Sequence, residues 1–180
     1  MAKPKSPAAK RNPLSRTVFS VPKNHLRIGE CNEHYGGVFA GMMRGTKGKP
    51  DYYLFVPPEP AAEAKLAWGG YAIEEPNATC AHDGLANTIA LRDSKVDHPA
   101  AEFCKSLELY GLSDYYLPSQ QELKLCQINC PEVFAKEWYW SSTQFSANYA
   151  WVQSFYFGNR DFGRKDGEYR ARAVRRLVIQ

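Results

Sequence analysis

The pattern of hydrophobic and polar positions is clearest in residues 111–143, where it predicts a capped helix followed by a strand. Ser119 and Glu122 have the S-x-x-E spacing of a capping box, in which each side chain satisfies a backbone amide at the start of a helix. The apolar side of this helix continues through Leu123, Cys126 and Cys130. Pro131 ends or kinks the helix. The three rings of Trp138–Trp140 then predict a strand that carries core on one side and contacts on the other.

Two more helices are predicted between Cys80 and Gly111. The first follows the segment D-G-L-A-N-T, where Asp83 or Asn87 caps it. Its partly buried residues are Ile89 and Leu91. The second begins at Pro99, in the first turn, and has Gly111 at its C′ position. Its single apolar face has i, i+3, i+4, i+7 spacing and consists of Ala100, Phe103, Cys104 and Leu107.

Strands are predicted on both sides of these helices from alternation and turn residues. The upstream strands are Thr17–Val21, Leu26–Cys31, the glycine-rich or bulged segment Tyr35–Met43 and Asp51–Val56, and Pro60–Ala64 could start a short helical turn. Downstream, a β-meander is predicted from Tyr139–Ser142, Tyr149–Tyr156 and Tyr169–Ile179, with a turn at Gly158–Asp161. The pattern as a whole predicts an α+β fold, with antiparallel strands and two to three helices on one face or end of the sheet.

Length and composition are typical of one domain, residues 16–180, preceded by an arm. The chain has 180 residues, of which 44% are hydrophobic, and a net charge of +4. This charge is mild and does not by itself indicate a nucleic-acid partner. No apolar run approaches the length of a membrane span, so we expect none.

The arm, residues 1–15, is basic and proline-rich and contains no acidic residue. Its cations are Lys3, Lys5, Lys10 and Arg11. Such a segment cannot bury enough surface to fold alone. It is either a solvated tail or an arm that orders on a partner, which is an acidic protein surface or nucleic acid. Because no apolar region follows these charges, we expect no secretory signal.

Four ordered blocks of the sequence resemble a known family. They are D-Y-Y-L-P-S-Q-Q-E-L, Y-W-S-S-T, A-W-V-Q-S-F and Y-R-A-R-A-V-R-R, and the resemblance covers roughly residues 80–178. The sequence is similar to the Lcl C-terminal domain family, a C-type-lectin-like module of bacterial surface proteins, prophages and phage fibres. The resemblance implies a C-type-lectin-like fold, in which Tyr53–Val56 and Lys65–Trp68 are placed like a pair of strands that precedes the helices. It does not specify a function, because that fold hosts many ligands.

The resemblance also implies that residues 144–166 form an exposed ligand-binding face. This segment is rich in Tyr, Trp, Asn and Arg, the residue types that recognition surfaces use. The candidate ligand-binding residues are Phe145, Asn148, Tyr149, Trp151, Gln153, Asn159, Arg160, Phe162 and Arg164. The alternative is that half of these rings belong to the core and the rest lie in turns.

The closing strand carries four arginines, Arg170, Arg172, Arg175 and Arg176. They could contact phosphates. We favour a structural role, in which guanidinium groups stack on aromatic rings or pair with carboxylates such as Asp114. Nucleic acid is therefore not an expected partner.

The sequence contains no convincing catalytic or metal-binding set. Its five cysteines fit small buried thiols made in a reducing cytoplasm, although one disulfide could form between an unassigned pair. Their spacing matches no standard zinc site. Glu75–Asn77 spells the E-P-N of C-type lectins, but no W-N-D follows, so we treat it as chance. We name no catalytic residue, metal ligand or cofactor.

The resemblance and the arm together predict a non-enzymatic structural protein of a virion, either a phage tail or head fibre or a decoration protein. It would be made in the host cytoplasm and exposed on the virion. The arm would contact other virion proteins, and the face would bind a host-surface glycan or protein receptor. Such fibres are commonly trimers, so we expect a homo-oligomer. The alternatives are a bacterial surface adhesin domain and an enzyme of the formylglycine-generating type, whose cysteine site does not map onto these cysteines.

Overall fold

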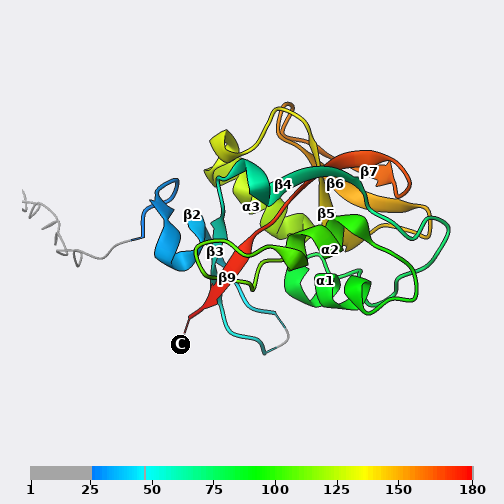
Figure 1. Ribbon diagram of the computed structural model, residues 1–180, viewed down its shortest axis with the longest axis horizontal. Helices are drawn as coiled ribbons and strands as arrows, with labels where there is room; N and C mark the ends of the chain where they lie inside the picture. The colour runs from blue at the N-terminus through cyan, green and yellow to red at the C-terminus, as the bar shows by residue number, and fades with distance from the viewer. Residues whose placement is uncertain (1–25, 47, 180) are drawn as a thin grey trace, which may run out of the picture.

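The computed structural model describes residues 26–46 and 48–179 (Figure 1). Three α-helices pack with two β-sheets, which confirms the predicted α+β class. The predicted strand Thr17–Val21 and the basic arm lie outside the described residues. Within the described part of the chain, no helix is both long and apolar enough to cross a bilayer.

The first sheet has four antiparallel strands in the order β1-β2-β3-β9. Its strands are β1 (Cys31–Asn32), β2 (Gly37–Met43), β3 (Tyr52–Val56) and β9 (Arg175–Val178). A bulge interrupts β2 between Phe39 and Gly41, as the glycines predicted. The predicted strand Leu26–Cys31 is wrong over most of its length. Gly29 takes a positive φ of 83° and Glu30 N donates to Arg27 O, so the chain turns before β1 begins.

The second sheet has five strands in the order β4-β8-β5-β6-β7. They are β4 (Glu63–Ala67), β5 (Trp138–Gln144), β6 (Tyr149–Ser154), β7 (Arg160–Arg164) and β8 (Glu168–Arg172). Strand β7, which the sequence pattern did not predict, extends the sheet beside β6. The meander prediction holds for β5 and β6. It is wrong for β8, which lies between β4 and β5 and pairs in parallel with β5 at Tyr139 and Arg170. Arg160 and Asp161, predicted to lie in a turn, pair with β6.

The predicted closing strand Tyr169–Ile179 is divided between the two sheets. Its first part is β8 and its last part is β9, and Figure 1 shows this red ribbon passing from one sheet to the other. At the crossing, Val174 exchanges both backbone hydrogen bonds with Tyr116, each 2.9 Å long. Both parts of this segment have an extended backbone, so its side chains alternate without interruption. This alternation therefore gives no sign that the chain changes sheets.

The helices are α1 (Gly84–Arg92), α2 (Pro99–Ser106) and α3 (Gln120–Asn129). Short 3₁₀ turns lie at Glu33–Tyr35, Pro60–Ala62 and Pro131–Val133. Of the two predicted caps of α1, Asp83 is the one used, accepting from Ala86 N at 3.1 Å. Two details of the helix predictions are wrong, namely the partial burial of Ile89 and the end of the second helix at Gly111. Ile89 is 39% exposed, and α2 ends at Ser106, so Gly111 (φ 74°) serves the Leu109–Leu112 turn instead.

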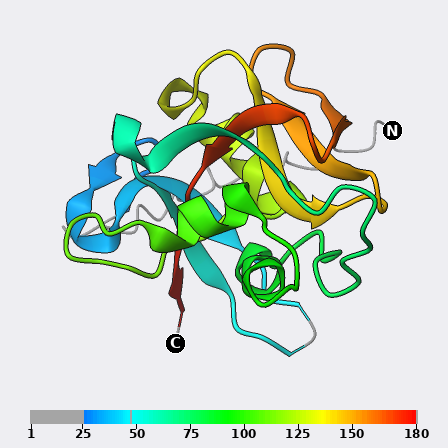
Figure 2. The same ribbon diagram turned by 45° about the vertical axis from the view of Figure 1, so that its right-hand side comes forward.

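Two hydrophobic clusters form the core. Helix α3 lies between the two sheets. One cluster packs Leu123 and Cys126 of α3 against β2 and β3. The other gathers around Trp68 and Trp140, with α1 and α2 packed against the five-stranded sheet. Figure 2 shows α1 end on beside α2. Because α3 contacts β2 as well as β5 and β6, it holds the two sheets together.

The capping box of α3 is formed as predicted, and its carboxylate does more than cap. Glu122 is fully buried, and its Oε2 accepts from Ser119 N at 2.7 Å and from Gly84 N at 3.1 Å. A Cβ on Gly84 would lie 2.3 Å from this oxygen, so the position requires glycine. Oε1 accepts from the hydroxyls of Tyr52 (2.6 Å) and Tyr116 (2.7 Å). One carboxylate thus joins both helix starts to β3 and to the segment before α3.

We expect Glu122→Gln to lower the free energy of unfolding by about 3 kcal/mol, because it removes a buried charge that several donors share and that faces Arg176. Urea denaturation monitored by tryptophan fluorescence measures the change. The matched control is Glu108→Gln, at an exposed position with no side-chain hydrogen bond to the described residues. Equal stabilities of the two variants would contradict the role assigned to Glu122.

Candidate functional site

Four of the predicted ligand-binding residues form an aromatic cluster on β6, β7 and the start of the loop that joins β5 to β6. The rings of Phe145 and Phe162 are stacked, with centroids 4.7 Å apart and planes 6° from parallel. Trp151 meets Phe145 edge on at 5.2 Å, and Tyr149 meets Phe162 edge on at 5.2 Å. Phe145 is 49% exposed and Phe162 is 45% exposed. We call these four residues the aromatic face.

Cross-strand pairing explains why these rings meet. Trp151 lies opposite Phe162, and Tyr149 lies opposite Arg164, so their side chains leave the same side of the β6–β7 pair. The intervening Ala150 and Val152 point into the core. The alternative interpretation of the segment, that half of its rings are core, is therefore wrong for these four rings, although Phe155 is buried.

The predicted arginines flank the aromatic face. The Arg164 guanidinium lies 5.0 Å from the ring centroid of Tyr71 and pairs with Asp166 at 2.7 Å. This pairing raises the pKa of Arg164 and lowers that of Asp166. Arg160 is exposed at the opposite end of β7, across from Gln153. Tyr71 was missed by sequence reasoning, because a lone tyrosine after two glycines carries no positional signal.

Three other predicted residues serve the backbone of the loops. Gln153 is buried, and its amide donates to the carbonyls of Ser154 (3.0 Å) and Asn159 (2.9 Å), so its side chain does not reach the surface. These hydrogen bonds hold the Gln153 side chain against the turn between β6 and β7. Asn148 and Asn159 are exposed, and their carbonyls accept from Lys165 N and Ser154 N respectively. Within the described residues, their side-chain amides make no hydrogen bond.

A polar staple fixes the loop that carries Phe145. The Glu74 carboxylate accepts from Gln144 Nε2 at 2.7 Å and from Ala147 N at 3.0 Å. The Gln144 Oε1 accepts in turn from Glu75 N and Lys165 Nζ, both at 2.7 Å. Residues 69–79 are therefore held against the β5–β6 loop, and the aromatic face is built on an ordered support rather than on a free loop.

Lys165, which lies within the predicted exposed face of residues 144–166, is fully buried. Its ammonium donates to Ile73 O at 2.7 Å as well as to Gln144, and lies 4.7 Å from the ring centroid of Trp68. Burial lowers the pKa of Lys165 to about 8, although Glu74 and Glu75 act in the opposite direction. Nothing in the sequence distinguishes this buried lysine from its exposed neighbours.

The four arginines of the closing segment are paired with carboxylates, as the structural interpretation predicted. Arg170 pairs with Glu63 and Glu137, and Arg172 pairs with Glu63 at 2.9 Å. Arg175 pairs with Asp114, the partner named from the sequence, and Arg176 pairs with Asp83 at 2.7 Å. The Arg176 guanidinium also lies over the rings of Tyr52 (4.3 Å) and Tyr116 (4.9 Å).

The cysteines are all free. Cys104, Cys126 and Cys130 are buried as predicted, Cys80 is partly buried, and Cys31 is exposed, contrary to prediction, because it lies on the short edge strand β1. Burial raises the pKa of the Cys104 and Cys126 thiols well above the usual range. Within the described residues, no group of three or more His, Cys, Asp or Glu side chains could hold a metal ion.

Glu75, the first residue of the E-P-N segment, has structural partners. Its carboxylate accepts from Ser94 Oγ at 2.6 Å and lies 3.1 Å from Nε2 of the buried His98. This carboxylate helps to hold residues 69–79 against the start of α2.

These features define an α+β domain that displays aromatic side chains from a stapled sheet edge. Comparison with protein families gives a match to the Lcl C-terminal domain over residues 62–175. The chain belongs to this family. The match begins earlier than the sequence blocks suggested, at the start of β4, and includes the whole five-stranded sheet. A search of curated proteins found no match.

We expect the stability of the protein to rise with pH across the titration of Lys165. The pKa of this lysine is about 8 in the folded protein against an ordinary value of 10.5, so between these pH values the unfolded chain binds more protons. Relative to Lys165→Met, the wild type should gain roughly 2–3 kcal/mol of unfolding free energy from pH 8 to 10.5.

Urea denaturation at a series of pH values tests this prediction. Lys65→Met, at an exposed position of β4, is the matched control. Its free energy of unfolding should change with pH in the same way as that of the wild type. If the free energy of unfolding of Lys165→Met also changes with pH as that of the wild type does, the lowered pKa assigned to Lys165 is wrong.

Proposed function

We propose that the chain is a non-enzymatic recognition domain with a C-type-lectin-like fold, carried on the surface of a virion as a tail or head fibre or a decoration protein. The aromatic face would bind a host-surface glycan or protein receptor. The basic arm would join the domain to other virion proteins. A bacterial surface adhesin domain is the alternative placement, and the recognition role is common to both.

The observation that carries the proposal is the exposure of stacked rings. Phe145 and Phe162 leave almost half of their area in water, although their stacking and the edge-on rings fix their orientation. Rigid aromatic area contributes binding energy with little loss of side-chain entropy. Flat rings also match the apolar faces of sugar rings. Arg160 and Arg164 at the two ends of β7 supply hydrogen-bond donors next to the rings.

The chemistry of the thiols supports a binding role over the formylglycine-generating alternative. A nucleophilic cysteine needs a lowered pKa. The pKa of each thiol with a resolved shift is raised instead, mainly by burial, as for Cys31, Cys104 and Cys126.

We expect Phe162→Ala to weaken ligand binding roughly tenfold or more, as for an aromatic anchor in a recognition surface. The assay is binding of the purified domain to a glycan array, followed by titration calorimetry with the glycans that bind. Phe157→Ala is the matched control, because Phe157 is 74% exposed but lies outside the aromatic face. The assigned face is wrong if both variants bind like the wild type, or if Phe157→Ala loses as much affinity.

Placement on a virion is tested separately. We expect quantitative mass spectrometry to find the chain at a stoichiometric level in purified particles, with few copies for a tail fibre and many for a decoration protein. Deletion of residues 1–15 should prevent incorporation while leaving binding by the aromatic face unchanged. Absence of the full chain from particles would favour the adhesin alternative, and normal incorporation of the deletion variant would contradict docking by the arm.

A further inference from the structure

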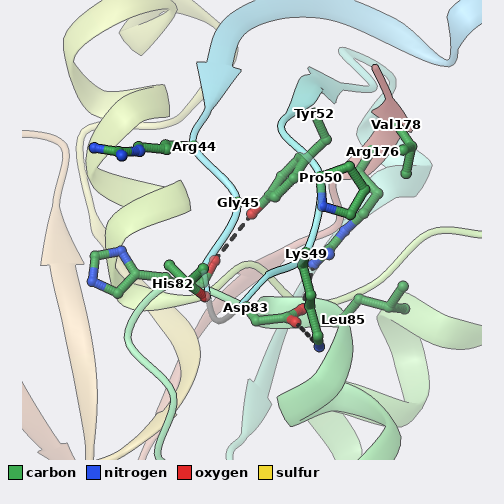
Figure 3. A pocket seen from close by; sticks show the side chains of 11 residues that line it. Arg44, Gly45, Lys49, Pro50, Tyr52, His82, Asp83, Leu85, Arg176 and Val178 are labelled. Atoms are coloured by element: carbon green, nitrogen blue, oxygen red, sulfur yellow. Dashed lines mark hydrogen bonds and ion pairs between the residues drawn. The ribbon is translucent and has the colours of Figure 1, made fainter. Parts of the chain in front are cut away.

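A groove lies away from the aromatic face, on the four-stranded sheet. Its first part is a hollow of about 210 Å³ where the β2–β3 connection meets the start of α1 and strand β9 (Figure 3). Its second part is a hollow of about 290 Å³ along α3. Arg44 and His82 line both hollows, so the two lie side by side. We call them together the α3 groove.

The walls of the α3 groove are basic. Arg44, Lys49, Lys124 and Arg176 line it, and Asp83 is its only acidic lining residue among those described. Lys49 and Arg176 already neutralise Asp83, at 2.6 Å and 2.7 Å, as Figure 3 shows. The groove therefore presents excess positive charge.

Two of these cations have no anionic partner within the described part of the chain. Arg44 is exposed, and its guanidinium makes no hydrogen bond or ion pair with the described residues. Lys124 donates only to neutral oxygens, Gln127 Oε1 at 2.8 Å and Gly158 O at 2.9 Å. This differs from the arginines of β8 and β9, each of which is paired with a carboxylate. Arg44 can form a two-pronged contact with an incoming carboxylate.

The floor between the cations is apolar. Met43 and Leu125 line the second hollow, and Ile128 at its end is 64% exposed. The first hollow adds Leu85 and Val178. A ligand that fits these walls therefore combines carboxylates with a large apolar side chain, which is the composition of an acidic amphipathic peptide rather than of a small inorganic anion.

The charge of the α3 groove indicates whether its ligand belongs to this chain or to a partner protein. Residues 1–25 of this chain contain no Asp or Glu and carry several Lys and Arg, so they would be repelled by the groove. We propose that the α3 groove binds an acidic, apolar peptide segment of a partner protein, as a second site independent of the aromatic face. The domain can then hold one partner through the four-stranded sheet and present the aromatic face to another.

The test is fluorescence anisotropy with the full chain and a labelled short peptide that alternates Glu and Leu. The expected result is saturable binding that weakens with added salt and is lost when Gln replaces Glu in the peptide. Arg44→Glu should lower the affinity roughly fivefold, since an exposed charge pair is worth up to about 1 kcal/mol. Arg92→Glu is the matched control, because it makes the same charge change on the exposed surface of α1.

Three results would overturn the proposal. One is equal loss of affinity in Arg44→Glu and Arg92→Glu, which would show attraction to net charge alone. Another is equal binding of the Glu and Gln peptides. The third is loss of binding in Trp151→Ala, which would place the peptide on the aromatic face. Amide chemical shifts in Arg44→Glu establish that the variant is folded, and failure of this second site would leave the recognition proposal unaffected.

Discussion

The buried carboxylate of Glu122 is the contact on which the arrangement of the domain depends. It accepts hydrogen bonds from the first residue of α1, the cap of α3 and two tyrosine hydroxyls, and it lies 3.4 Å from the Arg176 guanidinium. A buried charge is costly unless all its hydrogen bonds are made, so each donor must be in place for the others to be stable. Fixing this one side chain therefore fixes two helices and two strands relative to one another.

The arginines of the C-terminal segment extend the same principle across both sheets. Arg170 and Arg172 hold Glu63 on β4, whereas Arg176 holds Asp83 at the cap of α1. The segment crosses between the sheets at Val174, so its ion pairs lie on both sides of the crossing. Each arginine of this segment is paired with a carboxylate of the domain, whereas Arg160 beside the aromatic face and Arg44 and Lys124 in the α3 groove have no carboxylate partner among the described residues.

The two surfaces proposed for binding differ in how they are built. The aromatic face stands on β6 and β7, and the β5–β6 loop that carries Phe145 is held by hydrogen bonds among Glu74, Gln144 and Lys165. The α3 groove is formed where a loop, a helix start and an edge strand meet. Rings on a rigid sheet suit a ligand recognised by shape and stacking, whereas basic walls around an apolar floor suit an extended acidic chain.

The sequence by itself determined the α+β class, the family, the capping box at Ser119, the cap at Asp83 and the structural use of the arginines, because these follow from local spacing and from side-chain chemistry. Only the tertiary structure decided that Tyr169–Ile179 serves two sheets and that β8 lies beside β5, since strand alternation is the same in either sheet. It also decided that Lys165 and Gln153 are buried while Phe145 and Phe162 remain exposed. Burial depends on what packs from distant parts of the chain. Lys165, for example, donates to Ile73 in residues 69–79, a contact that no local pattern around Lys165 records.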